Sequence, residues 1–100
     1  MLGTLKHGDY ARQLNTKFNV AVEENEPLEL ELVEVSELKT GGGQESFSLL
    51  FHGAKDKFLP QKLYELEHDT LGQGSIFLVP VGAKDEVIEY EAVFNRLTKD

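Results

Sequence analysis

The stretch LELELVEV at residues 28–35 alternates acidic side chains with leucines and valines. Successive side chains of a β-strand point to opposite faces, so this period of two predicts a half-buried strand. The three leucines share one face, whereas Val33 and Val35 fall on the opposite parity. One extra residue near Leu32 and Val33 would restore the inward facing, so we predict a β-bulge there. The glutamates are interpreted as the solvent face of the strand.

The same period of two recurs through most of the chain. The predicted strands are 17–22, 28–38, 46–52, 62–68, 75–81 and 87–96. ENEP at 24–27 predicts a turn, and GGG at 41–43 predicts a flexible connection. Pro80 cannot donate to a strand ladder, so it marks an edge, a bulge or the end of its strand.

Only the first segment has helical spacing. Leu5, Tyr10 and Leu14 lie near one side of a short helix predicted at about 6–15. Six strands at short spacing after one helix predict a mainly β fold. We expect a single small antiparallel six-stranded barrel or sandwich with one short N-terminal helix, in one domain over residues 1–100.

The 18 acidic and 10 basic residues give a formal net charge of -8. This sign repels nucleic-acid backbones, so we expect no nucleic-acid partner. The chain has no cysteine, which excludes disulfides and thiolate sites. The longest apolar run, 76–81, is far shorter than the roughly 20 residues of a membrane helix, so we expect no membrane insertion. Without a signal peptide after Met1, the default expectation is the cytoplasm, with export lacking a cleaved signal left open.

Two predicted strands, 46–52 and 75–81, carry large apolar residues on both parities. The predicted core parity holds Leu49, Phe77 and Val79, and the opposite parity holds Leu50, Ile76 and Leu78. An antiparallel strand that is apolar on both faces needs cover on both. The N-terminal helix is one possible cover, and a partner protein is the other. Leu50, Ile76 and Leu78 are therefore the candidate protein interface.

No residue pattern predicts catalysis or a cofactor. His52 and His68 could meet if their two strands pair, and Glu67 or Asp69 could then complete a metal site. The tight ligand spacing that is typical of zinc sites is absent, so the histidines are interpreted as surface residues at strand ends. Acids at period two are interpreted as a solvated sheet face, and no GxSxG or phosphate-binding pattern occurs. We predict no metal, no cofactor, no catalytic residue and no enzyme activity.

Five segments carry a resemblance to a known family: PLELELVEV, FSLLFHG, LPQKLYELEHDTLG, IFLVPVG and YEAVFNR. Together they resemble a small family of uncharacterised bacterial domains with the pattern FSLLFxG, LPQxxYxLEHxxLG, FLVPVG and YEAVFN. The resemblance runs from Leu5 to Arg96. Asp69 departs from it where many members have proline, and Lys6 where a threonine or serine would cap the helix. Because the family has no established activity, no catalytic residue is transferred.

The family's members are often encoded beside proteins with a phage-tail-collar-like domain. The resemblance therefore implies an accessory or structural role in a tail-like or filamentous surface assembly. Our first hypothesis is a non-enzymatic structural or protein-interaction module with protein partners or self-association. The alternative is a small-ligand carrier or enzyme with a pocket inside the barrel, although six short strands rich in Phe and Leu favour a filled interior.

Overall fold

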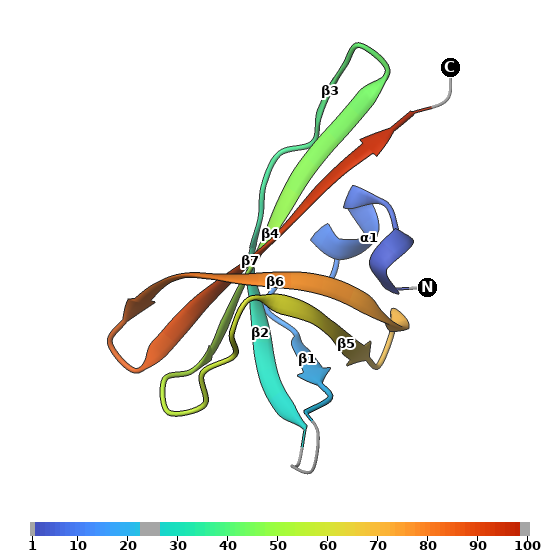
Figure 1. The fold of residues 1–100 in the computed structure, drawn as a ribbon. Helices are drawn as coiled ribbons and strands as arrows, with labels where there is room; N and C mark the ends of the chain where they lie inside the picture. The colour runs from blue at the N-terminus through green and yellow to red at the C-terminus, as the bar shows by residue number, and fades with distance from the viewer. Residues whose placement is uncertain (1, 23–26, 99–100) are drawn as a thin grey trace.

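The computed structural model describes residues 2–22 and 27–98 of the chain (Figure 1). Two short helical turns come first, and seven strands follow them. The elements are η1 (Leu2–Thr4), α1 (His7–Ala11), β1 (Lys17–Val20), β2 (Leu28–Val35), β3 (Lys39–Gly41), β4 (Gln44–Ala54), β5 (Lys62–His68), β6 (Gly72–Lys84) and β7 (Val87–Leu97). The predicted turn at 24–27 lies, apart from Pro27, outside the described residues.

The strands form one antiparallel sheet that closes on itself. Their order is β2-β1-β5-β6-β7-β4-β3, and β2 also pairs with β4. This last pairing joins the two ends of a six-stranded barrel and leaves β3 as an added strand on β4. The predicted mainly β, antiparallel fold is confirmed, and it is a barrel rather than a sandwich.

The predicted bulge in β2 is present. Leu32 is aligned with Phe51 of β4, whereas Glu34 is aligned with Leu50, so the register shifts by one residue between them. The shift turns Val35 towards the core, against which it packs. A second register shift between Pro80 and Gly82 confirms the bulge that was one of the expectations for Pro80.

The core follows the alternation of most strands. Leu30 and Leu32 of β2 are buried, as are the inward residues of β1, β4, β5 and β7. The other buried apolar strand residues are Phe18, Val20, Phe47, Leu49, Phe51, Tyr64, Leu66, Ile76, Leu78, Ile88, Tyr90 and Ala92. Aromatic rings meet across the barrel, for example Phe18 and Phe51, whose ring centroids are 5.2 Å apart. The interior is therefore occupied by side chains.

The N-terminal segment differs from its prediction. The helix covers His7–Ala11 rather than 6–15, and an unpredicted turn, η1, precedes it. Asn15 has a left-handed φ of 68°, which does not continue a helix. Because position 6 lacks a capping hydroxyl, the carboxylate of Asp9 caps the start instead by accepting from the Lys6 N–H at 3.1 Å.

Leu2 and Tyr10 form the cover that the N-terminal segment provides. Both are fully buried, and the Tyr10 ring stacks on Phe94 at 5.4 Å between centroids. Leu5 packs against the core from a partly buried position, but Leu14 is exposed. The predicted lid is thus partly wrong, because the helix ends before Leu14 and its place is taken by Leu2.

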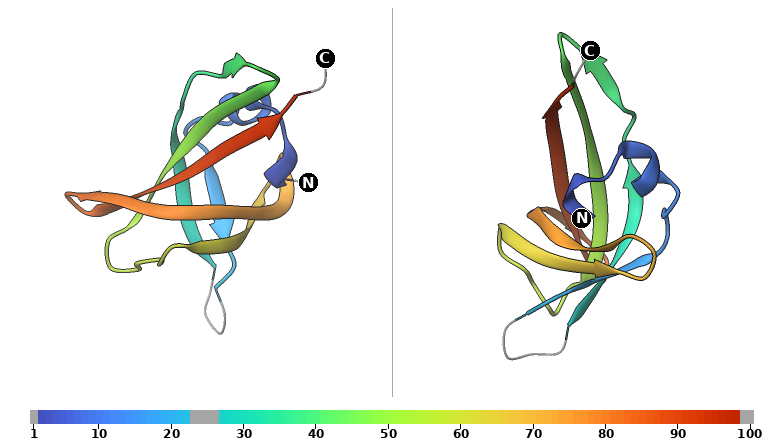
Figure 2. Two further views of the ribbon diagram at one scale, coloured as in Figure 1. Left: turned by 45° about the horizontal axis from the view of Figure 1, so that its top comes forward. Right: turned by 90° about the vertical axis from the view of Figure 1, so that its right-hand side faces the viewer.

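One part of the sheet extends beyond the barrel. β3, the first half of β4 and the second half of β7 form an arm that contributes to principal extents of 44 × 26 × 23 Å (Figure 2). At its tip Gly42 and Gly43 have φ values of 58° and 77° and form a two-residue hairpin turn, since Gly41 pairs with Gln44. The predicted flexible connection is therefore a tight turn between two strands.

Candidate protein-contact surface

The parity of β6 is the reverse of the predicted one. Ile76 and Leu78 are 2% and 0% exposed, whereas Phe77 is 48% exposed. Ile76 is aligned with the buried Tyr64 of β5, and both side chains enter the core. Ile76 and Leu78 are therefore core residues, and their prediction as an interface is wrong.

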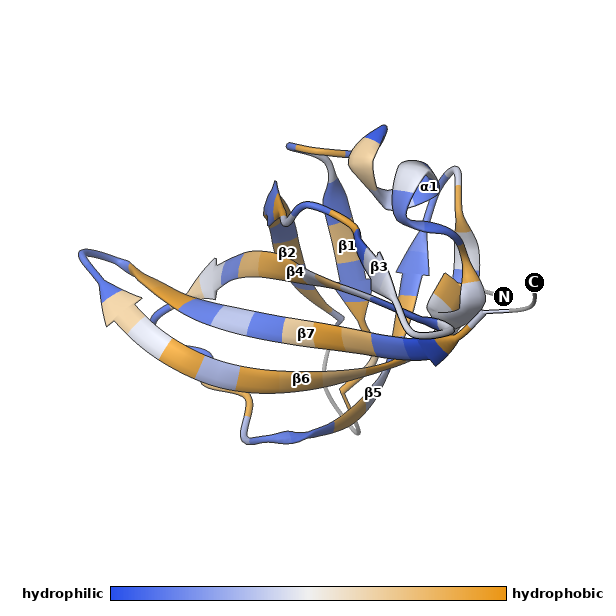
Figure 3. Cartoon of the chain, turned by 90° about the horizontal axis from the view of Figure 1, so that it is seen from above, coloured by the Kyte–Doolittle hydropathy of each residue, from blue (hydrophilic) through white to orange (hydrophobic). Residues whose placement is uncertain are grey.

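Gly74 gives a physical reason for this parity. A Cβ at Gly74 would lie 2.7 Å from the backbone N of Leu2, so only glycine allows η1 to lie against the strand here. Residues two and four positions on, Ile76 and Leu78, then share the inward face. The sequence of β6 alone does not show which set of side chains points inward, because apolar residues occupy consecutive positions. Figure 3 shows this long apolar stretch of β6.

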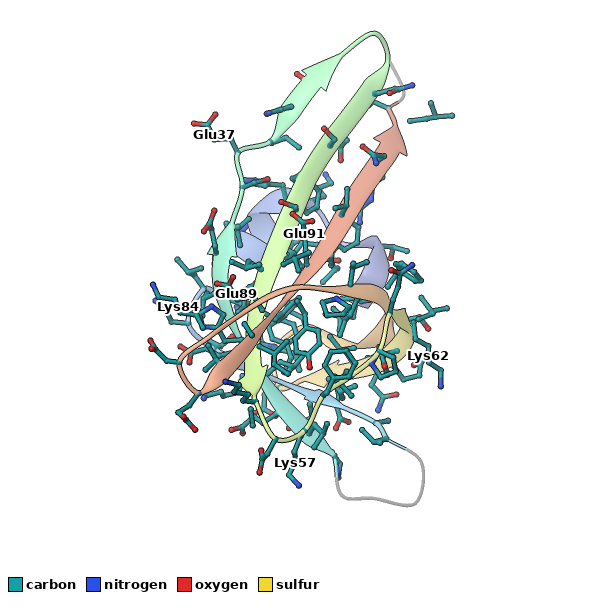
Figure 4. The ribbon with its side chains drawn as sticks, turned by 60° about the vertical axis from the view of Figure 1, so that its left-hand side comes forward. Glu37, Lys57, Lys62, Lys84, Glu89 and Glu91 are labelled. Atoms are coloured by element: carbon teal, nitrogen blue, oxygen red, sulfur yellow. The ribbon has the colours of Figure 1, made fainter. Side chains whose placement is uncertain are left out.

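Leu50, the third predicted interface residue, does lie on the outer face of the barrel. It is half-buried and is aligned with Glu91 on one side and with Glu34 on the other. Acidic side chains therefore flank it on both neighbouring strands. Glu89 and Glu91 follow each other along the same face of β7 (Figure 4).

Three exposed apolar residues lie on the outer face of neighbouring strands. Leu63 of β5 is paired directly with Phe77 of β6, and these side chains are 57% and 48% exposed. Val93 of β7 is 58% exposed and lies two residues beyond Glu91, which is paired with Val79. Phe77 lies two residues before Val79 on the outer face of β6, beyond the last residue that β6 pairs with β7. We call Leu63, Phe77 and Val93 the apolar row.

Sequence reasoning missed this row for identifiable reasons. Phe77 was assigned to the core because both parities of β6 are apolar. Leu63, however, alternates in step with Glu65 and Glu67, and this pattern already indicated that it lies on the solvent-exposed face of its strand.

An apolar hollow of about 530 Å³ adjoins Leu63. It is lined by Ala21, Val22, Phe58, Leu59, Pro60, Lys62, Leu63, Tyr64 and Glu65. Two tyrosines hold the loop above it: the Tyr64 hydroxyl donates to the Pro60 carbonyl at 2.6 Å, and the Tyr90 hydroxyl accepts from the Leu59 N–H at 2.9 Å. Burial raises the pKa of both tyrosines above 10.0, so their hydroxyls stay protonated at neutral pH.

The acidic residues of the outer face have polar partners in neighbouring strands. Glu65 accepts from the Ser75 hydroxyl, and Glu67 accepts from the Gln73 amide at 3.0 Å. Lys17 lies 3.7 Å from Glu31 and 3.9 Å from Glu29. These are cross-strand contacts of a solvated sheet, each worth a fraction of a kcal/mol up to about 1 kcal/mol.

The structure does not bring His52 and His68 together. His52 on β4 faces Glu89, with 3.1 Å between Nε2 and Oε2. His68 on β5 is only 6% exposed, so its interpretation as a surface residue is wrong. β4 and β5 are not paired, and the described part of the chain contains no group of three or more side chains that could hold a metal ion.

His68 instead joins two turns of the chain. Its Nδ1 accepts from the N–H groups of Thr70 and Leu71 at 3.0 and 3.1 Å, and its Nε2 lies 2.8 Å from the Thr16 hydroxyl. Burial lowers the pKa of His68 from its ordinary value of 6.5, and the nearby Asp69 opposes part of this shift. A neutral imidazole fits these partners, which tie the two turns together.

In residues 2–22 and 27–98, none of the helical segments has the length and apolar character needed to span a membrane. No curated protein and no solved structure matches the chain. The family model of the domain of unknown function DUF6916 does match it, over residues 5–94. This range covers nearly all of the barrel and the cover formed by Tyr10. The chain therefore belongs to the DUF6916 family of domains of unknown function.

Proposed function

We propose that the protein is a non-enzymatic structural or protein-interaction module that binds a protein partner through the apolar row. The observation that carries the proposal is that β5, β6 and β7 all expose large apolar side chains on the outer face, where Leu63 and Phe77 are directly paired. Contiguous exposed apolar surface of this kind is typical of interaction sites. The adjoining hollow with the exposed Phe58 enlarges the apolar area.

The acids around the row contribute to selectivity. Glu91 and Glu34 flank Leu50, and Glu65 follows Leu63 on the same face of β5. Acidic neighbours disfavour an acidic partner and steer a neutral or basic one towards the row. The setting that we propose, a phage-tail-like or filamentous surface assembly, rests on the family resemblance. The elongated arm gives such a component a second region that could contact its neighbours.

The alternative proposal, a ligand pocket inside the barrel, has less support. The interior positions carry packed aromatic and aliphatic side chains such as Phe18, Phe51 and Leu49. Small barrels of this strand number fill their interior with side chains. The hollow beside Leu63 lies at the surface, where it suits an apolar side chain of a partner protein.

A photo-crosslinker placed in the row tests the proposal. Phe77 is replaced by a benzophenone-bearing phenylalanine analogue in the native cell, and the covalent products are identified by mass spectrometry. We expect protein adducts at position 77, either to another protein or to a second copy. The matched control places the same group at Leu14, another exposed apolar residue. Absence of protein adducts at 77, or equal yields at 77 and 14, would contradict the proposal.

A further inference from the structure

β7 has strand partners on both edges for only half of its length. β4 pairs with it from Val87 to Leu97, whereas β6 pairs with it only from Val87 to Glu91. Beyond Glu91, β6 turns away with β5, and β7 continues into the arm (Figure 1). Residues 92–97 therefore have one edge with no strand paired to it among the described residues.

The direction of the backbone groups on this edge follows from two hydrogen bonds. Thr98 donates to the Gly43 carbonyl at 2.8 Å, and Lys55 donates to the Glu86 carbonyl at 3.0 Å. In an antiparallel pair, hydrogen-bonded and non-bonded residue pairs alternate, so the even-numbered residues of β7 bond to β4. The odd-numbered residues turn their N–H and C=O groups to the other edge, which fits the pairing of Glu89 and Glu91 with β6. Val93, Asn95 and Leu97 thus present unpaired backbone groups.

The side chains on this edge do not block pairing. Proteins usually protect an open edge with a charged side chain, a proline or a bulge. Here the outward side chains are Val93, Asn95 and Leu97, and Leu97 is 85% exposed. Arg96, the one charged residue of 92–97, points inward and donates to the carbonyls of Gly3 and Leu5.

We propose that the open edge of β7 pairs antiparallel with β7 of a second copy of the chain, about a two-fold axis at Asn95. Asn95 then faces Asn95 of the second copy, and Val93 faces its Leu97. All of these are odd-numbered, so the register that satisfies the free backbone groups also places apolar side chains opposite each other. A shift by one residue would present even-numbered residues, whose backbone groups are already bonded to β4.

Charge favours a second copy as the occupant. Residues 92–97 contain no carboxylate, although the chain carries 18, so no acidic side chains of this segment meet at the edge, and Arg96 has Glu45 of its own chain at 3.9 Å. Pairing stops at Val93, because the edge of Glu91 is occupied by β6. Leu97 of the second copy then lies beside Val93, on the outer face that also carries Phe77. The inference rests on the proposed function, because the second copy would be the protein partner that covers the Val93 end of the apolar row.

Light scattering over a range of concentrations provides the first test. The wild-type mass should rise from one chain to two, whereas Asn95→Pro should stay a monomer with a native circular dichroism spectrum, because it removes a donor that β4 does not use. Val93→Lys should also stay monomeric. The matched control Val81→Lys changes a similarly exposed valine of β6, 50% against 58% for Val93, and should still dimerise. Dimerisation that Asn95→Pro and Val93→Lys leave unchanged would overturn the edge pairing.

A single cysteine gives the second test, because the natural chain has none. Directly opposed residues of a hydrogen-bonded antiparallel pair have Cα atoms about 5.5 Å apart, within disulfide range. Asn95→Cys should therefore form a covalent dimer on mild oxidation, and Ser48→Cys on the outer face of β4 should not. A wild-type chain that stays monomeric, together with an Asn95→Cys variant that forms no disulfide, would overturn the inference. Crosslinking from position 77 would then still decide the proposed function separately.

Discussion

His68 joins two turns that lie far apart in the sequence. The Thr16 hydroxyl donates to the Gln13 carbonyl at 2.6 Å, so the Nε2–H of His68 must donate to the Thr16 oxygen. Nδ1 then carries no proton and accepts from Thr70 and Leu71. This tautomer is assigned from the hydrogen-bond partners. A proton on Nδ1 would face two N–H donors, so protonation of His68 opposes the fold.

The stability of the protein should therefore fall in mild acid. The pKa of His68 is lowered in the folded state, so the unfolded chain binds its proton first as the pH decreases. The contribution of His68 is complete above its ordinary pKa of 6.5 and is lost as the pH falls through the folded pKa. Urea midpoints measured from about pH 7.5 to about pH 5 should show this loss. His68→Asn keeps an acceptor and should flatten the profile, whereas His52→Gln should not, and identical slopes in all three proteins would contradict the assignment.

Gly53 should be intolerant of even one added methyl group. A Cβ at this position would lie 2.6 Å from Cδ2 of Leu30 and 3.1 Å from Cε2 of Tyr90, both buried. Gly53→Ala should therefore lower the free energy of unfolding by about 1–3 kcal/mol. The control is Gly41→Ala, whose Cβ would meet no atom within 4 Å and should change stability by less than about 0.5 kcal/mol. Equal effects in chemical denaturation would mean that the barrel relaxes freely around position 53.

At the scale of elements, strands differ in how clearly their own sequence determines which side chains point into the core. β7 alternates polar and apolar residues, and its predicted inward face from Ile88 to Phe94 is confirmed, although Phe94 is only partly buried. β6 has apolar residues at consecutive positions, and its facing depends on the contact of Gly74 with η1. The N-terminal turn thus helps to determine which side chains of β6 are exposed.

Substitutions at two neighbouring positions of β6 should differ in their effect on stability, because one side chain is buried and the other is exposed. Leu78→Ala removes buried volume from the core and should cost about 2–5 kcal/mol of unfolding free energy. Phe77→Ser removes an exposed ring and should change stability by less than about 0.5 kcal/mol, while it weakens binding at the apolar row. Thermal denaturation compares the two directly. A larger loss of stability for Phe77→Ser than for Leu78→Ala would mean that Phe77, and not Leu78, is the buried residue.

At the scale of the whole molecule, barrel closure and charge act together. The pairing of β2 with β4 closes the barrel, and in the arm β3 and the second half of β7 have open edges among the described residues. The net charge of -8 makes any two copies repel each other at long range. Association therefore depends on short-range contacts at the edge.

Salt should strengthen the association of two copies. The Debye length falls from about 30 Å at 0.01 M salt to about 8 Å at 0.15 M, which screens the repulsion between the acidic chains. Apolar contacts and backbone hydrogen bonds at residues 92–97 lose little over this range. Sedimentation at both salt concentrations should show a higher dimer fraction in the higher salt. A lower dimer fraction would point to pairing of opposite charges and away from the β7 edge.

The positions of six of the seven strands, the bulge at Leu32 and Val33 and the acidic outer face could be predicted from the sequence, because each depends on neighbours along the chain. β3 was not predicted, and the strand expected at 28–38 ends at Val35. The facing of β6, the burial of His68 and the closure of the barrel were decided by tertiary structure. Gly74 lies beneath Leu2, and His68 reaches Thr16 across 52 positions. No local periodicity encodes such contacts. The candidate site belongs to this second class, because Leu63 and Phe77 come together only through the pairing of β5 with β6.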